Sequence, residues 1–331
     1  MIFPMYNVLF SAPYMLPFID RFRPLLNHYE IDLIIPEKVE ERLTEQDILK
    51  HAGEFDGVIC GDDPYTAKVI EACAPRLKVI SKWGTGIDSI NKGACQRFGV
   101  VIGNTPNAFT NPVADTVLGY MLAFIRRQPW MDRSMKKGIW DKIPGKTLGE
   151  CTLGVIGIGQ IGKAVIRRAS AFGMTLLGND IVEVDPHFVT DLRLEMTSLN
   201  DLLPRSDFVS LNTDLNPTSR YLINQKTLPL MKETAVLINT SRGLVVKEDD
   251  LILALQNGTI RGAALDVFEV EPLPKDNPLL KMENVLLAPH NANSSPACWE
   301  RVHWNTIRNL IIGLGLDPTD LDSLRREEKD R

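Results

Sequence analysis

Short apolar runs alternate with helical patterns along the chain. In the first third, runs typical of buried strands are followed by stretches whose apolar residues recur with helical spacing. The predicted strands are Asn7–Phe10, Asp32–Ile35, Gly57–Cys60 and Lys78–Ser81, and the predicted helices are Phe18–His28, Glu45–His51 and Tyr65–Ala72. Thr44 and Asp47 resemble a capping box ahead of the second helix. This alternation predicts βαβ units around a parallel sheet.

A polar break at residues 104–107 ends this first series. Asn111 and Pro112 are typical of an N-cap and a first helical turn, so a helix is predicted to begin there. That helix, VADTVLGYMLAFIRR, is apolar nearly all round, and we expect it to be buried and to lead into a second domain. Further strands are predicted at Thr152–Ile156, Thr175–Leu177, Phe208–Leu211, Val236–Ile238, Gly262–Leu265 and Val285–Leu287. The closing helix, Pro296–Leu314, is expected to pack back on the first domain.

Composition narrows the class of protein. The chain has 331 residues, 44% of them hydrophobic and 24% charged, as in a globular protein of one or two domains. The net charge of -5 argues against nucleic acid as the main partner. Five cysteines without CxxC spacing predict neither a disulfide framework nor a metal site and favour a reducing, cytoplasmic location. No signal peptide or membrane span is expected.

A glycine-rich turn marks the expected cofactor site. The predicted strand Thr152–Ile156 leads directly into Gly157, Gly159 and Gly162, and a helix follows at Gln160–Phe172. In that context the glycines permit a tight turn, a close approach to a pyrophosphate and close packing of helix on strand. The alternative is a glycine-rich turn without a ligand.

Asp180 lies at the end of the next predicted strand. A carboxylate there is suited to accept hydrogen bonds from the adenosine ribose and to repel a 2′-phosphate. No Arg or Lys follows within residues 180–188 to hold such a phosphate, so NAD is favoured over NADP. The alternative is a surface acid.

Three polar residues follow apolar strands in the second domain, where open α/β sheets bind ligands. Arg242 follows one strand, Glu271 precedes a proline after the next, and His290 follows the last. Taken singly, they read as a surface Arg in a turn, a solvated acid and a structural His. Together they suit carbonyl reduction, in which Arg242 binds a carboxylate and polarises the carbonyl. His290 supplies the proton, and Glu271 favours the imidazolium form.

The alternation of strands and helices along the whole chain, together with the glycine motif, predicts the fold class. It is α/β, with two Rossmann-like domains on doubly wound parallel sheets.

The motifs GIGQIG, INTSRG, LDVFEVEP and APHNA resemble, in order and spacing, the D-isomer-specific 2-hydroxyacid dehydrogenase family. Its phosphoglycerate dehydrogenases and glyoxylate/hydroxypyruvate reductases look most similar. The resemblance implies an NAD-binding domain of residues 108–290, inserted into a flavodoxin-like substrate domain of residues 1–107 and 291–331. It also implies a homodimer formed largely through the NAD domains, acting on a small 2-hydroxy or 2-oxo acid. Arg242, Glu271 and His290 match the family's catalytic trio.

The resemblance also assigns residues to the cofactor and the substrate. Asp266 matches the acid that usually meets the nicotinamide carboxamide. The other positions expected to line NAD are Thr116, Gln160, Ile161, Asn212, Thr213 and Thr240. The segment SKWGTGID looks like the family's substrate loop, which gives Lys82, Trp83, Gly84, Thr85 and Gly86 as substrate-binding residues. Backbone N–H groups of the last three are expected to bind the substrate carboxylate, and the alternative is a plain glycine turn.

Several departures from the family pattern bear on the substrate. Lys82 stands where phosphoglycerate-type members usually carry Arg, and Trp83 stands where a small residue is common. Asn291 and Asn293 add hydrogen-bonding groups after His290. The chain also ends soon after the closing helix, so the C-terminal regulatory domain of the longer phosphoglycerate enzymes is not expected.

Other functions on the same scaffold stay open at this point. Formate dehydrogenases pair their His with Gln, which Glu271 argues against. Phosphite oxidation remains possible through Lys82. A third alternative is a non-catalytic, NAD-sensing scaffold like the C-terminal-binding corepressors. Reduction of a panel of 2-oxo acids by NADH discriminates an enzyme from such a scaffold.

Overall fold

The computed structural model describes residues 6–39 and 41–321. The chain divides into two compact units. The first comprises the described residues up to Ala108 together with those from Ser295 on, and the second comprises Phe109–Ser294. The second unit is therefore inserted into the first, as the resemblance implies. Residues 1–5, on which the expected lack of a signal peptide partly rests, lie outside the described residues.

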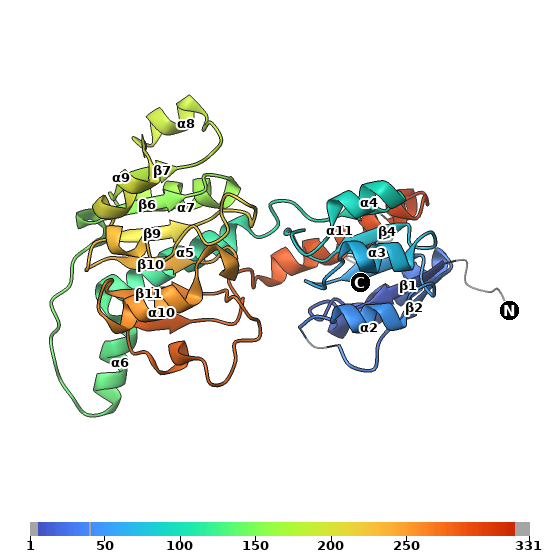
Figure 1. Cartoon of the computed structure of the whole chain (residues 1–331), viewed down its shortest axis with the longest axis horizontal. Helices are drawn as coiled ribbons and strands as arrows, with labels where there is room; N and C mark the ends of the chain where they lie inside the picture. The colour runs from blue at the N-terminus through green and yellow to red at the C-terminus, as the bar shows by residue number, and fades with distance from the viewer. Residues whose placement is uncertain (1–5, 40, 322–331) are drawn as a thin grey trace. The chain divides into compact units, whose positions relative to one another are not determined.

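The first unit is built on a parallel sheet (Figure 1). Its described strands are β1 (Tyr6–Phe10), β2 (Ile31–Ile34), β3 (Gly57–Cys60), β4 (Val79–Lys82) and β5 (Val101–Gly103). They lie in the order β2-β1-β3-β4-β5, which is the flavodoxin-like order. The central strands β3 and β4 are buried throughout, as expected for strands covered on both faces.

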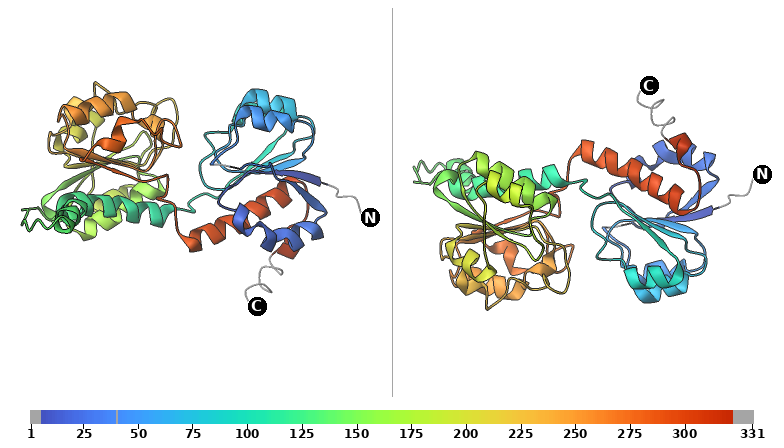
Figure 2. Two further views of the ribbon diagram at one scale, coloured as in Figure 1. Left: turned by 90° about the horizontal axis from the view of Figure 1, so that it is seen from below. Right: turned by 90° about the horizontal axis from the view of Figure 1, so that it is seen from above.

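Helices cover both faces of this sheet (Figure 2). They are α1 (Ile19–His28), α2 (Glu45–Lys50), α3 (Ala67–Cys73), α4 (Lys92–Phe98) and α11 (Pro296–Gly313). The predicted capping box is present at α2, where the Thr44 side chain accepts the N–H of Asp47 and the Asp47 carboxylate accepts the N–H of Thr44. The closing helix α11 packs on β3, β4 and β5, so the expectation that it returns to the first domain is confirmed.

The second unit has its own parallel sheet. Its described strands are β6 (Thr152–Ile156), β7 (Thr175–Asn179), β8 (Glu195–Met196), β9 (Phe208–Leu211), β10 (Val236–Asn239), β11 (Gly262–Leu265) and β12 (Val285–Leu287). They lie in the order β12-β11-β10-β9-β6-β7-β8. This is the doubly wound order of a Rossmann fold, with the reversal of strand order between β6 and β9.

The helices of the second unit are α5 (Thr110–Arg126), α6 (Gln128–Lys136), α7 (Gln160–Ala171), α8 (Pro186–Asp191), α9 (Leu199–Leu202) and α10 (Glu248–Gln256). Helices α5 and α7 cover one face of this sheet, and α9 and α10 lie on the other (Figure 2). A hydrophobic core lies beneath each pair of helices. Within the described ranges, no helix is both long and apolar enough to cross a membrane, and no group of three or more His, Cys, Asp or Glu side chains is placed to hold a metal ion.

The start of α5 corrects one sequence prediction. The N-cap is Phe109, so Asn111 and Pro112 lie inside the first turn instead of preceding it. The side-chain amide oxygen of Asn111, Oδ1, accepts a hydrogen bond from Arg168 of α7, at 3.2 Å, instead of capping the helix. The helix is also less evenly buried than its sequence indicates, because Asp115 and Gly119 are exposed.

The docking of α11 on β4 gives a test of the fold. Gly313 lies at the end of α11, and a methyl group there would overlap the side chain of Val79. Gly313→Ala is therefore expected to lower the free energy of unfolding, measured in urea, by about 1–3 kcal/mol. Gly119→Ala is the control, because open space surrounds that position in α5, and it should raise the same quantity by about 1 kcal/mol. Equal effects of the two substitutions would contradict this packing.

Candidate active site

Three neighbouring strands of the second unit end side by side at the carboxyl edge of its sheet. β10 pairs with β11, and β11 with β12, all in parallel. Arg242, Glu271 and His290 follow these strand ends in that order. Because parallel strands present their carboxyl ends at one edge, residues that are far apart in the chain are gathered there.

His290 and Glu271 are in direct contact. His290 Nδ1 lies 2.9 Å from Glu271 Oε2, and Oε1 of Glu271 accepts the N–H of Phe268 at 2.9 Å. An ionised carboxylate can only accept hydrogen bonds, so Nδ1 bears the proton in this contact and donates it. Nδ1 is thereby committed, and proton exchange between His290 and a substrate has to use Nε2.

Asp266 fixes the backbone that carries His290. Its carbonyl oxygen accepts the N–H of His290 at 2.8 Å. Its carboxylate, in a residue only 1% exposed, accepts the N–H groups of Asn291 at 2.7 Å and Ala292 at 2.9 Å. Burial raises the pKa of Asp266, and the two N–H groups act in the opposite direction. These bonds hold His290 in the left-handed backbone region, at φ 51°, which residues with a side chain rarely adopt.

Sequence reasoning missed this positioning by Asp266 and a similar one by Asn239. Asn239 ends β10 and is 1% exposed. Its amide nitrogen donates to the carbonyl oxygen of Arg242 at 3.0 Å, and its amide oxygen accepts the N–H of Ser241 at 3.1 Å. The available signal was a polar residue at the end of an apolar strand. The contact of Asp266 with nicotinamide stays a prediction.

The loop of Arg242 packs against the segment that leads to Glu271. A Cβ at Gly243 would overlap the backbone of Phe268, so this close approach requires glycine. Arg242 Nη1 donates to the carbonyl oxygen of Ser241 at 2.8 Å. The structure thus brings Glu271 and His290 into contact and places Arg242 on the adjoining loop.

The glycine motif forms the turn between β6 and α7. Gly157 has φ 86°, and a Cβ there would lie 2.8 Å from the carbonyl of Asn212, beside the reversal of strand order. No atom lies within 4 Å of the Cβ position of Gly159, whereas a Cβ at Gly162 would overlap the Gly157 carbonyl. These are the tight turn, the open backbone and the close packing that the motif predicts.

The positive end of α7 and the carboxylate of Asp180 flank this turn. Gly159 is the N-cap of α7, and no side chain caps the helix. Its first N–H groups are therefore suited to a phosphate. The Asp180 carboxylate accepts the N–H of Ile158 at 2.5 Å and that of Val182 at 3.0 Å, so it also ties the end of β7 to the glycine turn.

Buried polar atoms at the same edge of the sheet fit a bound dinucleotide. Asn212 Oδ1, Thr213 Oγ1 and Thr240 Oγ1 have no hydrogen-bond partner within the described part of the chain. Such atoms are normally satisfied in a folded protein, so these three suit a polar ligand. All three were expected to line NAD. The open backbone at Gly159 and the uncapped start of α7 complete a site that fits the cofactor.

The remaining cofactor residues expected from the sequence stay predictions. The Thr116 hydroxyl donates to the Pro112 carbonyl of its own helix at 2.9 Å. Gln160 and Ile161 occupy the first turn of α7, where Gln160 is exposed and Ile161 is half-buried.

In the first unit, the expected substrate loop follows β4. The N–H groups of Gly84, Thr85 and Gly86 donate to no backbone carbonyl within the described residues, as an anion-binding turn requires. Lys82 and Trp83 are both buried, at only 3% and 4% exposed. Lys82 Nζ lies 3.0 Å from Asp62 Oδ1, so its charge is already paired.

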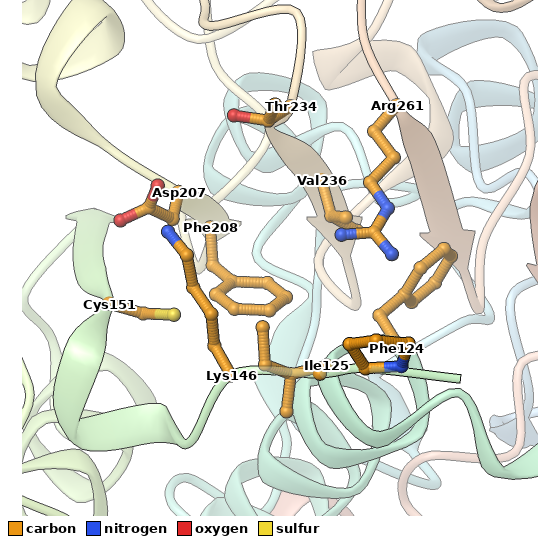
Figure 3. Close-up of a pocket in the computed structure, with 11 residues that line it drawn as sticks. Phe124, Ile125, Lys146, Cys151, Asp207, Phe208, Thr234, Val236 and Arg261 are labelled. Atoms are coloured by element: carbon orange, nitrogen blue, oxygen red, sulfur yellow. The ribbon is translucent and has the colours of Figure 1, made fainter. Parts of the chain in front are cut away.

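A cavity of about 360 Å³ lies at the opposite, amino edge of the second unit's sheet (Figure 3). Phe208 and Val236, the first residues of β9 and β10, line it together with Lys146 and Arg261. None of the predicted site residues lines this cavity. Ligands of such sheets bind at the carboxyl edge, so we place the candidate site there.

Comparison with known proteins agrees with this geometry. Residues 118–292 match the family model described as D-isomer specific 2-hydroxyacid dehydrogenase, NAD binding domain. The chain is 39% identical to a glyoxylate reductase of Korarchaeum cryptofilum, with 86% of each chain covered. It is 38% identical to a D-3-phosphoglycerate dehydrogenase of Methanocaldococcus jannaschii over 78% of this chain, but spans only 49% of that protein.

A solved structure with bound ligands is also similar. The D-lactate dehydrogenase of Aquifex aeolicus, in complex with NAD and lactic acid, is 29% identical and superposes with a TM-score of 0.79, covering 91% of this chain and 93% of that one. The matched model spans more than half of the chain and coincides with the unit that carries the glycine turn and the His290–Glu271 pair. This chain therefore belongs to the D-isomer specific 2-hydroxyacid dehydrogenase family and is an NAD-dependent oxidoreductase that acts on CH–OH groups.

Proposed function

We propose that this enzyme reduces a small 2-oxo acid at C2 to the D-2-hydroxy acid, and catalyses the reverse oxidation, with Arg242, Glu271 and His290 as its catalytic residues. The observation that carries the proposal is the 2.9 Å contact between His290 and Glu271 at the carboxyl edge of the NAD-binding unit. The glyoxylate and hydroxypyruvate reductases among its relatives favour the same class of substrate.

When bound, NADH supplies a hydride to C2, and the oxygen on C2 then needs one proton. His290 Nε2 provides that proton, because Nδ1 is held by Glu271. Glu271 keeps the ring oriented and compensates the positive charge of the protonated imidazole. In the oxidation direction Nε2 takes the proton back from the hydroxyl group.

Arg242 binds the substrate carboxylate and the oxygen on C2. Its planar guanidinium donates in two parallel directions, which suits a carboxylate beside a carbonyl. Asn239 and Gly243 hold its loop against the segment that carries Glu271. This support limits the freedom of the loop, so less entropy is lost when the substrate is oriented.

In this proposal one unit binds the cofactor and the other binds the substrate carboxylate. The second unit binds NAD through the glycine turn, Asp180, Asn212, Thr213 and Thr240, and the first unit binds the substrate carboxylate through the N–H groups of residues 84–86. The uncapped α7 and the unpartnered oxygens at the carboxyl edge support the first assignment. The backbone N–H groups that donate to no carbonyl support the second.

We also propose a homodimer formed through the NAD-binding units and located in the cytoplasm. After α6, residues 137–147 form a segment without helix or strand, in which Trp140 is 78% exposed and Ile139 is 47% exposed. Exposed apolar side chains on such a segment are typical of an interface with another chain. Four of the five cysteines are buried and all five are free, in keeping with a reducing compartment.

His290→Ala tests the catalytic assignment. We expect kcat for 2-oxo acid reduction to fall about a hundredfold or more, as for the loss of a general acid, while the Kd for NADH changes less than about twofold. Steady-state kinetics at 340 nm and NADH fluorescence titration measure the two quantities. His187→Ala is the matched control, because His187 is exposed on α8 of the same unit. Unchanged turnover in His290→Ala would refute the role of His290.

Asp180→Ala tests the choice of cofactor. Removing the carboxylate removes the repulsion of a 2′-phosphate, so the ratio of kcat/KM for NADH to that for NADPH should fall at least about tenfold. The ratio is the appropriate measure, because Asp180 also supports the glycine turn and its loss weakens both cofactors. Asp191→Ala, at the exposed end of α8, is the control. An unaltered ratio in Asp180→Ala counts against contact with the ribose.

A further inference from the structure

An aromatic cluster stands next to the predicted substrate loop within the first unit. We define the cluster as Tyr14, Trp83, Trp299 and His303. Tyr14 follows β1 and Trp83 follows β4, so both lie at the carboxyl edge of the sheet. Trp299 and His303 come from the first half of α11. Neither the proposed chemistry of Arg242, Glu271 and His290 nor NAD binding uses these four side chains.

The three larger rings are in mutual contact. The ring centroids of Tyr14 and Trp83 are 5.5 Å apart, those of Tyr14 and Trp299 are 5.4 Å apart, and those of Trp83 and Trp299 are 5.8 Å apart. At this spacing the rings pack directly on one another and leave no room for a ligand among them. A ligand can therefore contact only the outer surface of the cluster.

Trp83 is the fixed inner member of the cluster. Its backbone N–H donates to the Cys60 carbonyl at 2.8 Å, and its indole Nε1 donates to His303 Nδ1 at 2.9 Å. Burial lowers the pKa of His303 to about 4, so this ring is neutral at neutral pH and Nδ1 remains an acceptor. Rotation of the Trp83 side chain into the loop would therefore break its bond to His303.

Trp299 and Tyr14 form the outer surface. Both side chains are partly exposed, in contrast to Trp83 at 4%. Trp299 Nε1 is buried and has no hydrogen-bond partner within the described residues. A buried indole N–H normally has a partner, so this donor is suited to a bound water molecule, while the partly exposed remainder of the ring is apolar.

The charges around the cluster disfavour an anionic substituent. Lys82 is paired with Asp62 at 3.0 Å, and the Tyr14 hydroxyl donates to Glu41 at 2.7 Å. Arg301, two residues after Trp299 on α11, donates to the carbonyl oxygen of Ala108 at 2.7 Å. A phosphate next to the aromatic surface would therefore lie near the carboxylates of Asp62 and Glu41, which repel it. The nearby cations, Lys82 and Arg301, already have partners.

We infer that Tyr14 and Trp299 form the wall against which the C3 substituent of the substrate packs, and that the enzyme selects 2-oxo acids with an uncharged, apolar substituent over phosphorylated ones. The inference rests on the proposed 2-oxo acid reduction. Trp83 directly precedes Gly84, and neighbouring Cα atoms are about 3.8 Å apart. When residues 84–86 bind the carboxylate of a small 2-oxo acid, its C3 substituent is therefore within reach of the rings of Tyr14 and Trp299, which pack on Trp83.

The first test compares matched substrates of the unaltered enzyme. The ratio of kcat/KM for 4-methyl-2-oxopentanoate to that for pyruvate reports the apolar wall, and we expect it to be about tenfold or more. The ratio of kcat/KM for hydroxypyruvate to that for 3-phosphohydroxypyruvate reports the effect of charge on the C3 substituent, and we expect it to be at least about tenfold. A preference for the phosphorylated acid overturns the inference. If none of these acids is reduced, the proposed function itself fails.

The second test assigns the selectivity to Trp299. In Trp299→Ala, the kcat/KM ratio of 4-methyl-2-oxopentanoate to glyoxylate should fall about tenfold, chiefly through KM, because glyoxylate has no substituent to place on the wall. Trp304→Phe is the matched control, since Trp304 lies on the same helix but donates its N–H to Glu300 and packs on Phe22. An unchanged ratio in Trp299→Ala, or an equal fall in Trp304→Phe, overturns the inference while leaving the proposed function intact.

Discussion

The hydrogen bond between His290 and Glu271 is the interaction on which the rest of the site depends. The two residues are 19 positions apart in the chain, and they meet because β11 and β12 are neighbours in a parallel sheet. The sheet alone does not set the distance. Asp266 binds the backbone on the far side of His290, and Phe268 binds the second oxygen of Glu271. Both partners are therefore fixed by residues of the loop that follows β11.

Close backbone approach is the second constraint on the site. Gly243 allows the Arg242 loop to lie on the backbone of Phe268, and Gly162 allows α7 to lie on the turn after β6. In both places any side chain would meet backbone atoms, which cannot move aside as the end of a flexible side chain does. The glycines thus link cofactor binding and catalysis to the same rigid edge of the sheet.

Much of this architecture was predictable from the sequence, for physical reasons. Buried parallel strands such as Gly57–Cys60 are continuous apolar runs, and the glycine turn has a fixed spacing, so both are visible without a structure. The edge strands β5 and β8 were missed, because they are only three and two residues long and neither contains a buried residue. The hydrogen bonds from the N–H groups of residues 291 and 292 to the Asp266 carboxylate were also missed, since such bonds produce no spacing pattern in the sequence. Nor does the sequence show that Lys82 is paired.

The most direct test of the account is a double-mutant cycle on His290 and Glu271, measured as kcat/KM for reduction of one 2-oxo acid. If Glu271 acts by orienting the His290 ring and stabilising its protonated form, removing Glu271 lowers kcat/KM only in an enzyme that still has His290. The account predicts that Glu271→Ala slows the wild-type enzyme strongly but slows the His290→Ala enzyme by less than about threefold. Multiplicative losses in the double variant would contradict it, because they would show that the two side chains act independently.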